Sequence, residues 1–279
     1  MAILKSTSIN DTGYLGLPNG TTAQRPSSPS AGYMRWNTTE SHVELYDGSN
    51  WVPWNVSSGP DIITDSLILH YSTLSSNSYG GTGTTWYDLS GNGVNASIAG
   101  NPTFVSGTPS YFDMDGSDDI FTVTGRDWRQ NFTFEIWTQV DNNAAANGLF
   151  GQGPPGNSTG MHILTNPTTS RGMIFAFYAN DNDYQGNYTF SNNTWYHWVF
   201  TYNHSTYNKE FYADGVLQTP GASVENAYAG TGDWKIGGIY NTGGSKIAGK
   251  ISIVRAYTKT LSQSEVQHNY NAQKTTFGK

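Results

Sequence analysis

Short runs of β-branched and aromatic residues recur along this chain, separated by clusters of turn-forming residues. From Ile62 onward the runs include "SLILHYS", "DIFTVTG", "GMIFAFYA" and "GKISIVRAYTKT". The clusters between them are rich in Gly, Asn and Asp, which supply the backbone conformations that tight turns require. About ten such strands in one domain are typical of two packed antiparallel sheets. The pattern therefore predicts an all-β, two-sheet antiparallel jelly-roll sandwich and argues against a helical or α/β fold.

The run "NFTFEIWTQV" alternates with a period of two, so its side chains divide between the two faces of a strand. One face carries Phe132, Phe134, Ile136 and Val140, and the other carries Thr133, Glu135, Trp137 and Gln139. Glu135 has two open interpretations, a charge on the sheet surface or a ligand contact.

Two further signals concern packing. His197 alternates with aromatic residues in "TWYHWVF", which favours a hydrogen-bonded core or near-core histidine over a catalytic one. For the same reason, packing within the fold is predicted for Trp86, Trp195 and Trp198. One helix is expected in "TLSQSEVQHNYNAQ", because Ser262 and Glu265 have the spacing of a capping box.

The N-terminal part has a different organisation. Residues 1–31 are rich in Pro and Gly and predict an extended arm. Residues 33–54 predict a three-stranded antiparallel ribbon with a hairpin at Asp47-Gly48. We therefore expect an arm and β-ribbon module over residues 1–57, a linker over 58–61, and the sandwich over 62–279.

A ribbon of this size buries too little apolar surface to offset its chain entropy. The chain has no cysteine, so neither a disulfide nor a thiolate-bound metal can stabilise it. The ribbon is therefore expected to dock on the larger domain, on a copy of itself or on another protein.

Charge and composition exclude several classes of function. The formal net charge is −7 with only 14 Lys and Arg, so no basic face for nucleic acid is expected. The first residues, "MAILKSTSIND", do not resemble a signal peptide, and no apolar run has the length of a membrane span. The expectation is a protein made in a cytoplasm that does not insert into membranes.

Several segments of the larger domain, in order, resemble the laminin-G-like, concanavalin A-like lectin/glucanase superfamily over about residues 62–275. They are "TTWYDLSGNGVNASIAGNPTF", "YFDMDGSDDIFTVTG", "NFTFEIWTQV", "NTWYHWVFTYN", "FYADGVLQ" and "GKISIVRAYTKTLSQSEVQHNYNA". This resemblance implies a lectin-like jelly roll.

The first 54 residues resemble a different family, a module common in structural proteins of tailed bacteriophages. The resemblance lies in Gly-Thr-Thr, then Arg-Pro-x-x-Pro-x-x-Gly, a strand, and Glu-x-Tyr-Asp-Gly-x-x-Trp. It implies a virion protein such as a tail fibre, whisker or capsid decoration, located on the virion. Its partners through residues 1–57 would be other virion proteins and further copies of itself, most simply as a homotrimer.

Carbohydrate binding needs exposed aromatic faces beside hydrogen-bonding groups. The segment "FYANDNDYQGNYTF" offers both, and its candidate residues for a host-surface glycan are Tyr178, Asp181, Asp183, Tyr184 and Tyr188. The alternative is a solvated turn whose Asn and Asp residues bond to their own backbone.

A second cluster, in "DMDGSDD", gathers Asp113, Asp115, Asp118 and Asp119. Calcium prefers several carboxylate and carbonyl oxygens, so calcium is the one cofactor left open. Asp-Gly is first a turn signal, however, and the spacing is not that of an EF-hand, which favours a structural turn.

No catalytic pattern is found. Glucanases of the superfamily carry Glu-x-Asp-x-x-Glu on one strand, and that motif is absent, so an enzyme is not expected. The sequence thus predicts a virion protein that displays a carbohydrate-binding lectin-like domain. Its rivals are a purely architectural decoration or cement protein and, less favoured, a polysaccharide depolymerase.

Overall fold

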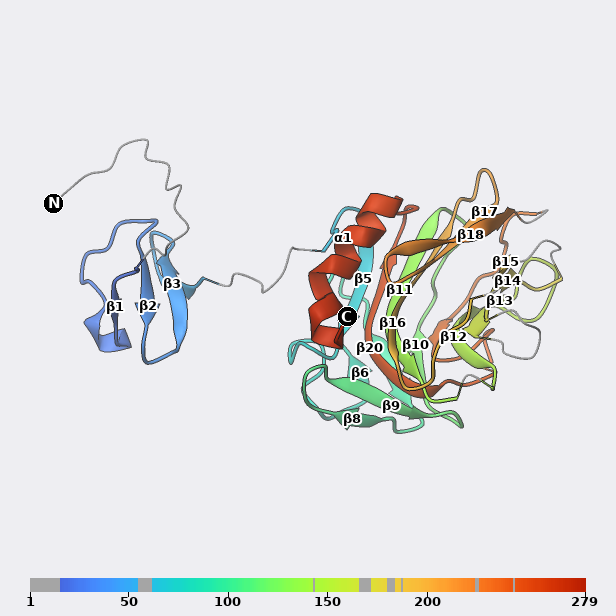
Figure 1. Cartoon of the computed structure of the whole chain (residues 1–279), viewed down its shortest axis with the longest axis horizontal. Coiled ribbons are helices and arrows are strands. Elements are labelled where there is room, and N and C mark those ends of the chain that lie inside the picture. Colours follow the sequence, from blue (N-terminus) through green and yellow to red (C-terminus); the bar gives the residue numbers. More distant parts are fainter. Residues whose placement is uncertain are drawn as a thin grey trace. The chain divides into compact units, whose positions relative to one another are not determined.

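The computed structural model describes residues 16–54, 62–142, 144–165, 172–179, 184–186, 188–223, 226–242 and 244–279. The chain divides into two compact units, Met1–Gly59 and Pro60–Lys279 (Figure 1). Within the described residues, no helix is long and apolar enough to cross a membrane.

The N-terminal unit is a four-stranded sheet with the strand order β1-β2-β3-β4. Its strands are β1 (Asn19–Gly20), β2 (Met34–Asn37), β3 (His42–Tyr46) and β4 (Trp51–Pro53), with a 3₁₀ turn, η1 (Thr22–Gln24), after β1. The expected ribbon contains β2, β3 and β4, and β4 is an edge strand, as Pro53 requires. The arm differs from the expectation, because Asn19 and Gly20 pair in parallel with Trp36 and Asn37.

The interior of this unit is polar. Glu44 is fully buried and accepts hydrogen bonds from Arg25 Nη2 (2.6 Å) and Asn37 Nδ2 (2.9 Å). The hydrogen bonds from Arg25 lower the pKa of Glu44 against the opposing effect of burial. The interior of this small unit thus contains a paired and hydrogen-bonded charge where a larger domain would have apolar side chains.

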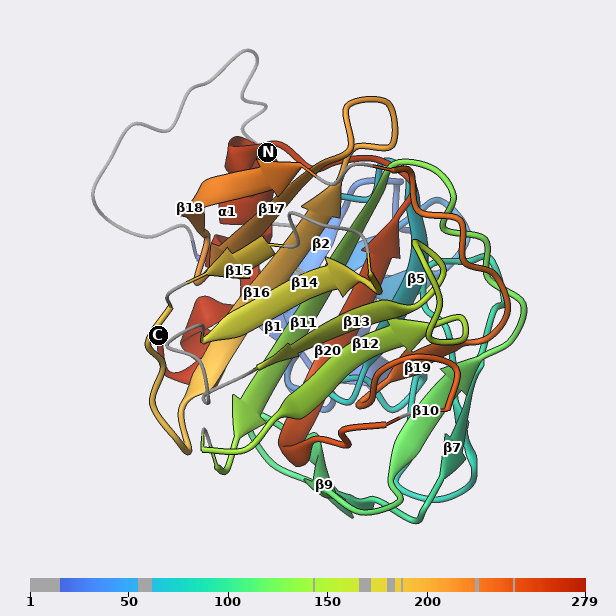
Figure 2. The ribbon, with the colours of Figure 1, turned by 90° about the vertical axis from the view of Figure 1, so that its right-hand side faces the viewer.

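The larger unit is the predicted all-β antiparallel sandwich. Its first sheet, which faces the viewer in Figure 2, has the order β15-β14-β13-β12-β19-β10-β7-β6. These strands are β15 (Tyr184–Gly186), β14 (Met173–Phe177), β13 (Met161–Thr165), β12 (Asn147–Gln152), β19 (Trp234–Ile236), β10 (Ile120–Val123), β7 (Ala96–Ala99) and β6 (Thr85–Trp86).

The second sheet has the order β18-β17-β16-β11-β20-β9-β8, and β5 also pairs with β20. Its strands are β18 (Val216–Ser223), β17 (Asn208–Ala213), β16 (Trp195–Tyr202), β11 (Phe132–Val140), β20 (Ala248–Tyr257), β9 (Tyr111–Asp115), β8 (Thr103–Val105) and β5 (Leu67–Ser72). The start of β20 pairs with β9 and its end with β5.

Aromatic side chains fill the space between the two sheets. Phe134 lies 4.7 Å from both Trp128 and Trp234 between ring centroids, and Trp234 stacks on Phe150 at 5.0 Å. Such pairs contribute about 0.5–1.5 kcal/mol each beyond the area that they bury. Trp86 and Trp198 are also fully buried, as expected.

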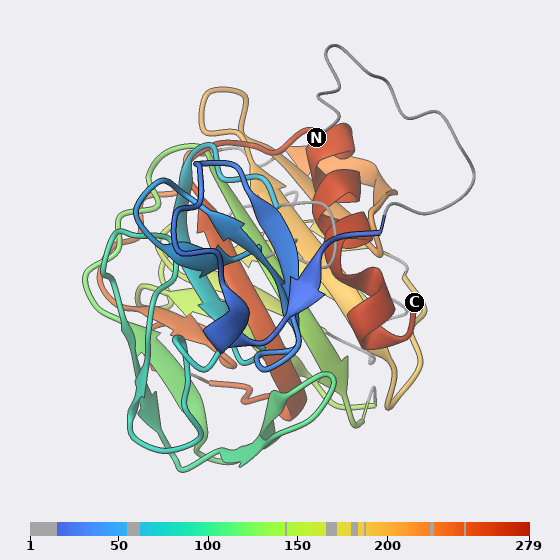
Figure 3. The ribbon, with the colours of Figure 1, turned by 90° about the vertical axis from the view of Figure 1, so that its left-hand side faces the viewer.

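The outer face of the second sheet is covered by helix α1 (Gln263–Gln273) and the 3₁₀ turn η3 (Lys274–Phe277) (Figure 3). The predicted capping box starts this helix: Ser262 Oγ accepts from Glu265 N, and Glu265 Oε2 accepts from Ser262 N (2.8 Å). Phe277 stacks on Trp137 with ring centroids 4.1 Å apart. Because this cover is in place, every residue of β11 is buried on both faces.

Candidate functional site

The residues predicted to bind carbohydrate lie around the end of β14. Tyr178 follows that strand and is 41% exposed. Tyr184 begins β15, where its backbone pairs with Phe175. Asp181 and Asp183 lie outside the described residues. Among the tyrosines predicted to stack on a sugar, Tyr178 is therefore the one that the structure places at the surface.

Tyr188 packs differently from Tyr178. Its ring is half-buried and meets Trp198 and Phe211 edge to face, with centroids 5.4 and 5.8 Å apart. Burial raises the pKa of its hydroxyl to about 12. Tyr188 therefore contributes to packing, although its neighbours in sequence are polar, because the aromatic partners come from β16 and β17.

Two residues that the sequence reasoning missed join Tyr178 at the surface. The Tyr240 ring lies 6.0 Å from that of Tyr178 and 5.1 Å from that of His162, measured between centroids. Tyr178 is exposed, and His162 and Tyr240 are partly buried. We call these three residues the ring cluster. It presents aromatic faces beside the Tyr hydroxyls and the imidazole, which is the combination that a pyranose ring requires.

Glycines in β12 allow the segment that carries Tyr240 to lie directly on the first sheet. A Cβ on Gly151 would stand 2.2 Å from Tyr240 N, and one on Gly148 would stand 2.4 Å from Ser245 O. Tyr240 N then donates to Met161 O at 3.1 Å. The close approach of the two backbones, which only glycine permits, fixes Tyr240 beside His162 of β13.

The backbone around the ring cluster holds several non-glycine residues in the left-handed region. Tyr240 has φ 54°, Ala179 has φ 52°, and Ser158 has φ 58°. Ser158 N donates to Tyr178 O, and Tyr178 N donates to Gly160 O. Such conformations cost about 1–3 kcal/mol each, and they also occur at turns elsewhere in the chain, such as Ser66 and Asn193.

A separate polar groove of about 430 Å³ lies on the second sheet beside the start of α1. Glu210 lines this groove, and its Oε2 accepts a 2.7 Å hydrogen bond from Tyr212 Oη. Burial and this bond raise the pKa of Tyr212, so the hydroxyl stays protonated. Thr201, Asn208 and Leu217 also line the groove. One carboxylate among hydroxyls, an amide and an apolar wall suits a neutral polyol.

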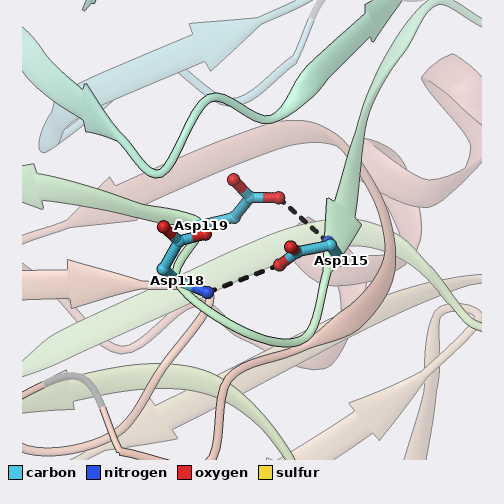
Figure 4. Close-up of side chains that lie close together, drawn as sticks. All are labelled: Asp115, Asp118 and Asp119. Carbon is cyan, nitrogen blue, oxygen red and sulfur yellow. Dashed lines mark hydrogen bonds between the residues drawn. The ribbon is translucent and has the colours of Figure 1, made fainter.

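The predicted calcium residues meet in part, in the turn between β9 and β10. Carboxylate oxygens of Asp115, Asp118 and Asp119 lie within 4.8 Å of one another (Figure 4). Asp113 is a residue of β9, where it pairs with Thr103 and Lys250. An oxygen spacing of this size is compatible with a shared Ca²⁺, whose ligand distances are about 2.3–2.6 Å.

These carboxylates also bond to the turn itself. Asp115 Oδ1 accepts from Ser117 N at 2.7 Å, and Asp119 Oδ2 accepts from Asp115 N at 2.9 Å. Burial raises the pKa of Asp119. The same atoms therefore stabilise the hairpin in the absence of any cation, and the geometry alone fits both uses.

Glu135 occupies neither of its two expected positions. It is fully buried beneath α1, where it pairs with Arg255 and accepts from Asn269 Nδ2 at 2.8 Å. His197 Nε2 lies 3.0 Å from its Oε1, and His197 is fully buried, as expected. The prediction missed the burial of Glu135 because the covering helix comes from the far end of the chain. In this position the carboxylate cannot meet a ligand.

The family model described as the concanavalin A-like lectin/glucanases superfamily matches residues 115–267. No curated protein matches the chain in sequence.

Among solved structures, Trypanosoma rangeli sialidase in complex with the inhibitor DANA is similar with a TM-score of 0.58 at 16% identity, covering 82% of this chain and 36% of that chain. The binding domain of botulinum neurotoxin DC in complex with rat synaptotagmin II has a TM-score of 0.56 at 18% identity, covering 75% and 52%. This chain thus spans about a third to a half of these structures, and at such identities the likeness shows the fold alone.

Proposed function

Because this chain belongs to the concanavalin A-like lectin/glucanases superfamily, we propose that its larger unit binds a carbohydrate through the ring cluster. The observation that carries the proposal is the meeting of Tyr178, Tyr240 and His162 at the surface, on backbone that two glycines bring together. Aromatic faces cover the apolar face of a sugar, and the hydroxyls and imidazole bond to its hydroxyl groups.

Glycan-array binding of the full chain tests this proposal. Binding that falls in Tyr240→Ala places the glycan at the ring cluster. Binding that survives there but is lost in Glu210→Gln places it in the polar groove instead. An array on which no glycan binds favours the alternative, a purely architectural decoration or cement protein.

We also propose that the protein is a structural component of a bacteriophage virion, such as a tail fibre, whisker or capsid decoration. The support is the resemblance of residues 1–54 to a phage module together with the small size and polar interior of that unit. Residues 1–57 would attach it to other virion proteins and join its copies, most simply as a homotrimer. Several copies on one particle would convert weak glycan contacts into avidity.

Light scattering of the full chain, compared with a chain that starts at Asp61, tests the attachment role. A full-length oligomer that becomes monomeric on truncation supports it. A monomeric full chain, or an oligomer unchanged by truncation, argues against self-association through this unit.

A binding role is favoured over hydrolysis. The superfamily's Glu-x-Asp-x-x-Glu motif is absent, and Glu135 lies beneath α1. A polysaccharide depolymerase remains the third candidate, and release of reducing ends from capsular polysaccharide by the full chain would establish it.

A further inference from the structure

One face of the N-terminal sheet carries only apolar side chains. Strand register places six residues on it, in two rows of three across β2, β3 and β4: Trp36, Val43 and Trp54, and Met34, Leu45 and Val52. Neighbours within a row are cross-strand partners, whose side chains share a face. Trp54 follows β4 and joins the first row because its N–H donates to Val43 O at 2.7 Å. We call these six residues the apolar sheet face.

The apolar sheet face is open in the single chain. Trp36 is 41% exposed and Trp54 is 42% exposed, and the other four residues are partly exposed. In the larger unit, by contrast, the outer face of the second sheet is covered by α1 (Figure 3). A contiguous apolar surface that is left open marks a place where another surface binds.

The opposite face of this sheet gives the unit no apolar core. Its buried residues include Arg35, Asn37 and Glu44, and the side chain of Arg25 closes over Glu44. A buried ion pair contributes little net stability, because the desolvation of the charges offsets their attraction. The apolar sheet face is therefore the surface whose burial can offset the chain entropy of so small a unit.

The distribution of charge favours contact between N-terminal units. Met1–Gly59 has three basic and four acidic residues, a formal charge of −1, whereas Pro60–Lys279 has 11 basic and 17 acidic residues, a formal charge of −6. The larger units of two copies therefore repel each other more strongly than the N-terminal units do. The apolar sheet face has no ionisable side chain, so two such faces meet without opposing like charges.

The exposed large apolar residues of the larger unit do not lie together on one strand face. Among the described residues they belong to four separate segments: Leu74, Tyr87, Tyr178 and Val216. The same face on another copy does match the apolar sheet face, because two packed sheets interdigitate the apolar side chains of their inner faces. A surface that pairs with itself is what symmetric oligomers use.

We propose that the apolar sheet face is buried against the same face of other copies of this chain, so that the N-terminal sheets pack face to face. The inference rests on the self-association proposed for residues 1–57 and names the surface that carries it. In a trimer, each copy would turn this face towards the common axis. The assembled sheets would then share one apolar core, which a single copy lacks.

Protection of an introduced thiol tests what covers the face. The chain has no cysteine, so a single cysteine reports on one position. Val43→Cys places it at the centre of the first row, and Tyr33→Cys, the control, replaces a side chain of the same unit that is 49% exposed outside the face. In samples that light scattering shows to be oligomeric, iodoacetamide should modify the Val43→Cys thiol about tenfold more slowly than the control, because the reagent reaches it only when the interface opens. After dilution to the monomer, the two rates should become similar.

Trp36→Glu tests the same face through the oligomeric state. The new charge would be buried in a face-to-face interface, so self-association of the full chain should weaken about tenfold or more. The control, Tyr33→Glu, adds the same charge outside the face and should leave self-association unchanged, and melting curves check that both variants fold. Raising NaCl from about 0.1 to 1 M should not weaken the association, because salt screens charges and not apolar contacts.

Three results would overturn the proposal: an oligomer that Trp36→Glu leaves unchanged, slow modification of Val43→Cys in a monomer, or fast modification of Val43→Cys in an oligomer. The second result would mean that the chain covers its own face.

These outcomes are separable from that of the proposed self-association. If the oligomer is lost in a chain that starts at Asp61 but is unchanged by Trp36→Glu, self-association through residues 1–57 stays supported and the apolar sheet face is not its surface. A full chain that is monomeric at every concentration overturns both. Glycan binding of each Trp36→Glu chain should match that of the unaltered chain, because the ring cluster belongs to the larger unit.

Discussion

Replacing Glu135 by glutamine should strongly destabilise the larger unit. The Glu135 carboxylate and the Arg255 guanidinium are both fully buried, and they pair beneath α1. Glutamine keeps the shape of the side chain but removes its charge. Arg255 would then be left without its counter-ion in a place where water cannot replace it.

The magnitude follows from the pKa. Burial acts to raise the pKa of Glu135, but Arg255, His197 and Asn269 outweigh it and hold the pKa at about 2, against an ordinary value of 4.5. At about 1.4 kcal/mol per pKa unit, this lowering of the pKa corresponds to about 3.5 kcal/mol. Removing one partner of a buried ion pair costs about 3–5 kcal/mol, which agrees. For a domain of this size the melting temperature should fall by roughly 6–20 °C.

The pH dependence has a defined sign. Because the pKa in the folded state lies below its unfolded value, ionised Glu135 stabilises the fold fully above pH 4.5, and this contribution is lost as the pH falls towards 2. The melting temperatures of the unaltered chain and of Glu135→Gln should therefore differ most at neutral pH and approach each other between pH 4 and 2.

The control is Asp127→Asn. Its hydrogen bonds with Arg129 also hold the pKa of Asp127 at about 2. Both side chains of that pair are at least half exposed, however, and exposed pairs contribute about 0.2–1 kcal/mol. Calorimetric melting of both variants compares the two environments. A Glu135→Gln chain that melts within 2 °C of the unaltered chain, or no lower than Asp127→Asn, would refute the reasoning.

Three further predictions concern the cover of the second sheet, the ring cluster and the acidic turn. Phe277→Ala should cost about 3 kcal/mol in urea unfolding, because it removes a buried ring that stacks on Trp137; a loss below 1 kcal/mol would mean that η3 is not held by this contact. Gly151→Ala should shift the Tyr240 backbone, since the new Cβ would stand 2.2 Å from Tyr240 N, and so weaken glycan binding; unchanged affinity would show that Tyr240 takes no part. Asp115→Ala should cost about 0.5–1 kcal/mol, because water replaces its exposed hydrogen bonds to the N–H groups of Ser117 and Asp118, equally in EDTA and in CaCl₂; a loss seen only with CaCl₂ would assign the turn to calcium.

The regular elements of the larger unit could be predicted because their signals are local. The alternation of apolar and polar residues in the sequence predicted strand β11, and the spacing of Ser262 and Glu265 predicted where helix α1 begins. Both depend on hydrogen bonds and side-chain periods within a few residues. The sandwich then followed from the number of such runs and the absence of helical segments between them.

The environment of particular residues could not be predicted from local signals. Glu135 is buried because Asn269 and its helix return from the end of the chain. Tyr240 and His162 meet only because β12, β13 and β19 are neighbours in the first sheet. Strand order depends on long-range pairing, which neither periodicity nor turn residues specify.

The N-terminal unit shows the same limit. Its hairpin at Asp47-Gly48 was predicted by the turn residues, but β1 was not, because Asn19 and Gly20 carry no apolar pattern. Their pairing with β2 uses backbone groups, with Trp36 N donating to Pro18 O at 2.8 Å. The burial of Glu44 between Val43 and Leu45 could likewise be seen only once Arg25 and Asn37 were placed around it.

The most direct test of carbohydrate binding at the ring cluster is a titration calorimetry comparison of Tyr240→Ala with Tyr87→Ala, using the strongest glycan from an array. Tyr87 is 52% exposed on the same unit but is not part of the cluster. We predict that Tyr240→Ala weakens binding about tenfold, as expected for an aromatic residue at the centre of a site, while Tyr87→Ala binds like the unaltered chain and both keep its melting temperature. Equal affinity of the two variants for a glycan that the unaltered chain binds would contradict the assignment.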